Sequence, residues 1–117
     1  MSLTAYTTIP RTLLKAIREA IEDGSIDTWE TDADGDFTHS TAQWRMRAWM
    51  RVANIEPKES ITFGIIGRRG TNVTSREYAI YHGRFAEMLL SHFDGKFKRI
   101  EISALANKYD NVSGEKR

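Results

Sequence analysis

The segment from Thr74 to Phe93 constrains the fold of this chain more than any other. Thr74 and Glu77 have the spacing of a capping box, in which a hydroxyl and a carboxylate each bond a backbone amide that the first helical turn leaves free. Gly83 lowers helix propensity in the middle of the segment, so we expect another backbone to pass close to it. At 100° per residue, one broad face gathers Tyr78, Tyr81, His82, Phe85, Ala86, Leu89, His92 and Phe93. The sequence therefore predicts a long amphipathic helix that covers the core.

A second helix is predicted near the amino terminus. Pro10 suits the first helical turn, and Thr8 is the expected N-cap. Asp23-Gly24 ends the pattern, because glycine readily takes the left-handed conformation that closes helices. Apolar residues recur at helical spacing at Ile9, Leu13, Leu14, Ile17, Ala20 and Ile21. This helix therefore has one buried stripe.

Segments that alternate between apolar and polar residues predict β-strands. Residues 26–31 form a predicted strand with Trp29 turned inward, and residues 32–36 form a hairpin turn. Further strands are predicted at residues 44–54, 60–66 and 97–104. The fold class is α+β: a helix, a three-stranded antiparallel meander, a long helix and an additional C-terminal strand, with the helices packed on one sheet face. We expect a single domain over residues 1–106 and a flexible tail over residues 107–117, which are polar and aperiodic.

Residues 44–54 decide what the outer face of this sheet presents. If the segment is a strand, every second side chain points inward: Trp44, Met46, Ala48, Met50 and Val52. It turns outward Arg45, Arg47, Trp49 and Arg51. A helix is the alternative, because Ser40 and Gln43 imitate a capping box. The strand is favoured, since a helix would not gather the arginines on one side.

The composition excludes several classes of function. The 117 residues carry a net charge of +1 and no cysteine, which excludes thiol catalysis, disulfides and thiolate zinc sites. No apolar run is long enough to span a membrane and the amino terminus lacks a secretory signal, so we expect a cytoplasmic protein without membrane contact. Residues 19–36 contain eight acids and no Lys or Arg, whereas residues 44–70 contain six bases and two acids. We expect these two segments to lie side by side and neutralise each other.

The acidic turn does not match a calcium loop. Counting from Asp32, an EF-hand loop needs glycine at position six and glutamate at position twelve, but Phe37 and Gln43 stand there. Asp and Gly also favour tight turns for backbone reasons alone. We therefore expect a hairpin turn with no metal, and we expect no cofactor elsewhere.

The loop Gly67-Arg68-Arg69-Gly70 is a candidate anion site, because glycines let a phosphate approach the backbone and arginines supply charge ahead of a helix start. It is neither a Walker loop nor a dinucleotide-binding motif. The run IGRRGTNV, residues 66–73, resembles the core of KH domains, whose GxxG loop binds the backbone of single-stranded RNA. That resemblance implies a loop between two helices. Here a predicted strand precedes the loop, and Arg76 occupies an expected apolar position.

The chain contains no recognised catalytic motif, which favours a binding domain and leaves an enzyme open. We expect the outer sheet face around Trp49 to bind a protein partner or a second copy of the chain. The alternative is single-stranded nucleic acid, bound by Arg45, Arg47, Trp49, Arg51, Arg68 and Arg69. A second alternative is a small-molecule pocket or active site centred on His82, together with Tyr78, Tyr81 and Phe85.

Overall fold

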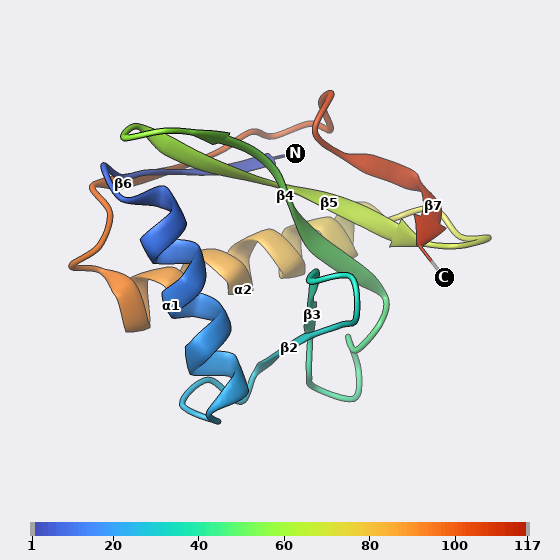
Figure 1. Ribbon diagram of the computed structural model, residues 1–117. Helices are drawn as coiled ribbons and strands as arrows, with labels where there is room; N and C mark the ends of the chain where they lie inside the picture. Colours follow the sequence, from blue (N-terminus) through green and yellow to red (C-terminus); the bar gives the residue numbers. More distant parts are fainter. Residues whose placement is uncertain (1, 117) are drawn as a thin grey trace.

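The computed structural model describes residues 2–116, and the side chains of residues 2–112. Met1 and Arg117 lie outside the described residues. The described chain is α+β, with two helices and a seven-stranded sheet, which confirms the α+β class; the sequence predicts four of the seven strands. Both helices lie below the same face of the sheet (Figure 1). The elements are β1 (Ser2–Tyr6), α1 (Pro10–Glu22), β2 (Trp29–Thr31), β3 (Phe37–His39), β4 (Ala48–Glu56), β5 (Ser60–Arg68), α2 (Ser75–Phe93), β6 (Arg99–Ile102) and β7 (Asn111–Lys116).

The first strand of the chain lies inside the sheet. The strand order is β2-β3-β4-β5-β1-β6, and β7 pairs with β5. All pairs are antiparallel except β5 with β7. Leu3 and Ala5 of β1 point into the core and are fully buried. Sequence analysis predicts no element at residues 2–6, because a five-residue alternation at the end of a chain is too short to stand out.

The two helices begin differently. Thr74 caps α2 as predicted: its hydroxyl accepts a hydrogen bond from the amide of Glu77 at 3.1 Å, and the Glu77 carboxylate accepts one from the amide of Thr74 at 3.0 Å. Helix α1 has Pro10 in its first turn, but Ile9 is its N-cap and makes no side-chain cap. The predicted Thr8 cap is therefore wrong. The hydroxyl of Thr7 instead accepts a hydrogen bond from the amide of Ile9 at 3.1 Å.

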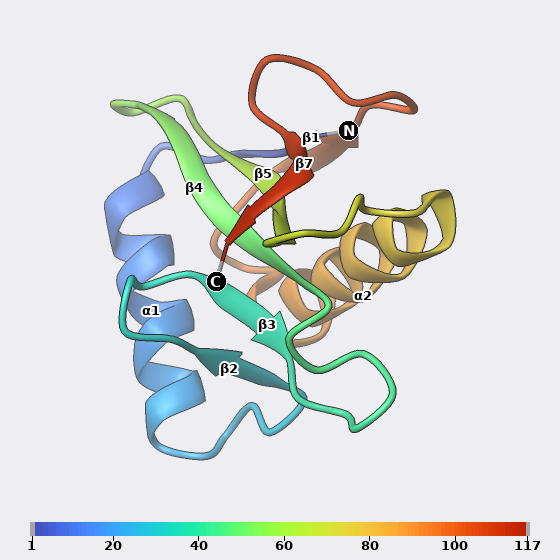
Figure 2. The same cartoon turned by 90° about the vertical axis from the view of Figure 1, so that its right-hand side faces the viewer.

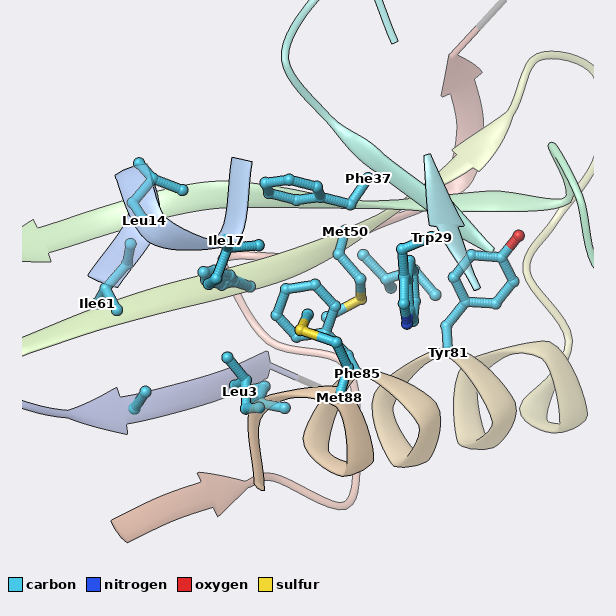
Figure 3. Close-up of a cluster of buried hydrophobic side chains, with 14 of the residues drawn as sticks. Leu3, Leu14, Ile17, Trp29, Phe37, Met50, Ile61, Tyr81, Phe85 and Met88 are labelled. Carbon is cyan, nitrogen blue, oxygen red and sulfur yellow. The ribbon is translucent and has the colours of Figure 1, made fainter. Parts of the chain in front are cut away.

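The core lies between the sheet and both helices, and its centre is aromatic (Figure 3). Trp29 is buried as predicted, with its ring centroid 5.1 Å from that of Phe85. The Phe85 ring also lies 4.7 Å from the Phe63 ring, centroid to centroid. The β2–β3 hairpin holds Trp29 there by pairing it with His39. Helix α2 is thus fixed against β2 and β5 by one cluster of rings.

Strand β4 begins later than the sequence predicts. Residues 48–54 are extended, as expected, and β4 continues to Glu56. Residues 44–47 form a turn instead, in which the amides of Trp44 and Arg45 donate to the carbonyl oxygen of Thr41 at 3.0 and 2.8 Å. Met46 takes a left-handed conformation, with a φ of 58°. The helix-like signal at Ser40 and Gln43 corresponds to this turn.

The C-terminal segment crosses the outer face of the sheet, opposite the helices (Figures 1 and 2). A Cβ atom added at Gly64 would lie 1.7 Å from the carbonyl oxygen of Tyr109, so only glycine fits there. Asp110 accepts hydrogen bonds from the amide of Ile65 at 2.9 Å and from the hydroxyl of Tyr78 at 3.2 Å. Residues 111–116, within the segment for which a flexible tail is predicted, form strand β7.

The close approach of a backbone was expected at a different glycine. A Cβ atom added at Gly83 would have no other heavy atom within 4 Å, and the residue is exposed. The prediction of a crossing at Gly83 is therefore wrong. Within residues 2–116, neither helix combines the length and the apolar character needed to cross a membrane.

Candidate anion-binding groove

A groove of about 710 Å³ opens where the turn before β4, the end of β5 and the start of α2 meet. Its floor and walls combine charged, polar and aromatic side chains. The lining residues are Gln43, Trp44, Arg47, Arg68, Thr71, Asn72, Thr74, Arg76 and Glu77.

Local backbone structure holds the groove in shape. The amide and hydroxyl of Thr71 both donate to the carbonyl oxygen of Arg68, at 3.1 and 2.9 Å. This tight turn is followed by the capped start of α2. Gly70 has a φ of +83°, a backbone conformation that is strained for any residue with a side chain. The chain therefore passes from β5 into α2 within a few residues and brings Arg68 close to the helix start.

Three arginines of the groove meet only one carboxylate. Glu77 lies 3.9 Å from Arg47, nitrogen to oxygen, and Glu77 also completes the helix cap. Among the described residues, Arg68 and Arg76 have no carboxylate within 4 Å. The guanidinium of Arg76 instead lies 5.6 Å from the centroid of the Trp44 ring. The groove therefore carries a net positive charge beside the positive end of the α2 dipole.

Two of the predicted binding arginines are neutralised elsewhere. Arg45 donates to both carboxylate oxygens of Glu30, at 2.7 and 3.2 Å, and these bonds raise the pKa of Arg45. Arg51 donates to both oxygens of Asp36, the shorter bond being 2.7 Å, and its pKa is raised mainly by those bonds. Asp36 is only 3% exposed. The prediction that the acidic and basic segments lie side by side and neutralise each other is confirmed for these pairs.

The structure does not place the six predicted binding residues on one surface. Trp49 is 2% exposed, so the prediction of an exposed Trp49 on the outer face is wrong. Arg47 and Arg68 reach the groove, and Arg69 is exposed in the adjoining turn. Sequence analysis missed the roles of Trp44 and Arg76. Arg76 could have been found, since it stands in the first turn of the predicted helix, six residues after Gly70.

The residues predicted to surround His82 lie in the core. His82 is 1% exposed, and its Nδ1 lies 2.8 Å from the carbonyl oxygen of Tyr78. The Tyr78 and His82 rings stack with centroids 4.4 Å apart. Tyr81 bonds through its hydroxyl to Thr38 and to the carbonyl oxygen of Trp44, and burial raises the pKa of Tyr81. These aromatic residues, with Phe85, pack α2 against the sheet.

The acidic turn has a backbone role. One carboxylate oxygen of Asp32 accepts hydrogen bonds from the amides of Asp34 and Asp36, both at 3.0 Å. The amide of Asp32 donates to the carbonyl oxygen of Asp36 at 2.9 Å, which closes the predicted hairpin. Carboxylate oxygens of Asp32, Asp34 and Asp36 lie within 4.8 Å of one another. The turn geometry accounts for this clustering.

Comparison with family models, with curated proteins and with solved structures finds no match to this chain. The structure places the Gly67–Gly70 loop between β5 and α2, a strand and a helix. The arrangement implied by the resemblance to KH domains, a loop between two helices, is therefore absent at this loop.

Proposed function

We propose that this domain is a non-catalytic binding module that holds the phosphate backbone of a nucleic-acid strand in the groove between the 41–47 turn and α2. One observation carries the proposal: Arg47, Arg68 and Arg76 converge on a groove whose lining holds a single carboxylate. By contrast, burial of Trp49 removes the main support for self-association through the outer sheet face.

Phosphate suits this groove for geometric and electrostatic reasons. A guanidinium group can donate two parallel hydrogen bonds to phosphate oxygens, and several such groups can share one backbone. The start of a helix adds the favourable end of its dipole. Arg69 extends the positive charge beyond the groove along the turn that follows β5. A strand with more than one phosphate would therefore satisfy several arginines at once.

The proposed contacts are to the phosphate backbone of the nucleic acid rather than to its bases. Trp44, the aromatic residue lining the groove, is 9% exposed and has the Arg76 guanidinium near its ring. It therefore offers little face for a base to stack on. A flexible single strand can follow the groove. We expect binding with little sequence preference and strong salt dependence.

Fluorescence anisotropy with a labelled single-stranded oligonucleotide tests this function. With three phosphates neutralised, the affinity of the wild-type protein should fall about twentyfold between 50 and 200 mM salt. Arg68→Ala and Arg76→Ala should each weaken binding severalfold and reduce the salt dependence. Arg45→Ala is the matched control, because Arg45 is already paired with Glu30 outside the groove. The proposal fails if Arg45→Ala weakens binding as much as Arg68→Ala, or if wild-type binding is insensitive to salt.

A further inference from the structure

Strand β6 ends the sheet on the side away from β2, and it is short, charged and open. It pairs with β1 on one side, and no described strand pairs with its other side. Figure 3 shows it as the outermost strand beyond β1. Ile102 of β6 is 42% exposed. An open edge carries backbone amides and carbonyls that can pair with another strand.

The register with β1 identifies which backbone groups face outward. The amide of Ser103 donates to the carbonyl oxygen of Ser2 at 3.0 Å, so Ser2 and Ser103 form a hydrogen-bonded pair. Bonded and non-bonded pairs alternate in an antiparallel ladder. Arg99 and Glu101 therefore direct their backbone groups to β1. Ile100 and Ile102 direct theirs to the open edge.

We infer that a second copy of this chain pairs with β6, antiparallel and in a register centred on Ile100. This register places Ile100 opposite Ile100 of the second copy, as a hydrogen-bonded pair. It also places Arg99 opposite Glu101 of the second copy, and Glu101 opposite Arg99 of the second copy. Both are non-bonded pairs, in which opposing side chains approach most closely. The dimer is thus held by two identical pairs of opposite charge.

The charges of β6 select this register over its neighbours. A register centred on Glu101 would set two carboxylates directly against each other. A register centred on Ile102 would place Arg99 beyond the end of the opposing strand. Only pairing around Ile100 satisfies both charges and uses the outward backbone groups. A contact of four residues is small, so we expect weak, concentration-dependent association.

The two charged side chains already lie on one face of β6, where the dimer needs them. The Arg99 guanidinium is 3.9 Å from the Glu101 carboxylate, and both side chains are mostly exposed. Arg99 also lies 4.0 Å from the centroid of the Tyr6 ring, which holds it over the sheet. Pairing across the edge would therefore extend an ion pair that is already arranged. The inference is independent of the anion-binding groove.

Sedimentation equilibrium over a wide concentration range tests the dimer. The wild-type protein should show a reversible monomer–dimer equilibrium. Arg99→Glu and Glu101→Arg should each lower the association constant about tenfold, because each turns two attractive pairs into two repulsive ones. An equimolar mixture of the two variants should recover association, since every opposing pair is again of opposite charge. Arg84→Glu is the matched control, an exposed charge on α2 near His39 at the other end of the sheet.

Three outcomes would overturn the inference: a monomer at every concentration, a dimer that neither single variant weakens, or a mixture that associates no better than the variants alone. Circular dichroism of each variant checks that the fold is intact. The mixture serves as its own folding control, because recovery requires two folded partners with complementary edges.

Discussion

Arg51 lies within β4 and Arg68 ends the neighbouring antiparallel strand β5, yet the surroundings of the two arginines differ. Arg51 donates three hydrogen bonds to a buried carboxylate, whereas Arg68 faces a groove and has no carboxylate within 4 Å among the described residues. The first arginine compensates a charge that folding has removed from water. The charge of the second arginine remains available to an anionic ligand. What an arginine contributes is therefore set by the carboxylates that the fold brings beside it.

The largest expected effect is the loss of stability when the Arg51 side chain is removed. Arg51→Ala removes three hydrogen bonds and a positive charge from the Asp36 carboxylate, which is 3% exposed, so the free energy of unfolding should fall by about 2 kcal/mol. Urea denaturation measures the loss. The double variant with Asp36→Ala should lose less than the two single variants together, because the pair is coupled. Arg68→Ala should stay within about 0.5 kcal/mol of wild type. Equal losses of stability for the two arginine variants would show that Arg51 and Arg68 contribute alike to the folded state.

A smaller effect is expected on oligonucleotide affinity when the carboxylate of the groove is removed. Glu77→Gln removes the groove's carboxylate while glutamine keeps the capping box, so α2 should remain capped. Without the negative charge 3.9 Å from Arg47, oligonucleotide binding should tighten about threefold at low salt. Anisotropy titration provides the measurement, and Glu87→Gln on the exposed side of α2 is the control. Unchanged or weaker binding by Glu77→Gln would argue against an anion in this groove.

The smallest effect concerns Arg84, which acts on a buried group through its charge alone. Burial lowers the pKa of His39, and the charge of Arg84 lowers it further. The folded state therefore binds fewer protons than the unfolded state just below the ordinary histidine pKa. Stability should decline as the pH falls below about 6.5 and should level off below the folded pKa.

Arg84→Gln should make that decline shallower, since it removes the second cause of the lowered pKa. Thermal unfolding between pH 7.5 and pH 5 measures the slope. Arg11→Gln, an exposed change on α1, serves as the comparison. A slope that Arg84→Gln leaves as steep as in wild type would show that burial alone sets the pKa of His39.

Local patterns predicted the local structure well. The capping box at Thr74 and Glu77 gave the correct start of α2, because both halves of the motif lie within one turn. Charge segregation correctly predicted that the acidic and basic segments lie side by side, as the ion pairs of Arg45 with Glu30 and of Arg51 with Asp36 show. Both signals depend on short or strongly biased stretches of sequence.

Contacts between segments that are distant in the sequence could not be predicted from such local patterns. The alternation around Trp49 predicted two faces, but it contains no information on what crosses the outer one. At Gly64 that face is crossed by Tyr109, from a segment with no periodic pattern of its own. For the same reason the close approach was expected at Gly83, where helix propensity draws attention, and was found at Gly64. The groove itself was not predicted. Two of its lining residues, Arg47 and Arg68, were among the candidate binding residues, and Trp44 and Arg76 join them only in the folded structure.

The position of β1 also bears on how the protein is made. Residues 2–6 are synthesised before both of their partners in the sheet, residues 60–64 and residues 99–102. Such long sequence separations slow folding, because a large loop must close before either contact is gained. During synthesis Leu3 and Ala5 therefore lack their β6 neighbour until residues 99–102 have emerged. Pairing of β1 with β6 is thus a late event that joins two segments made far apart in time.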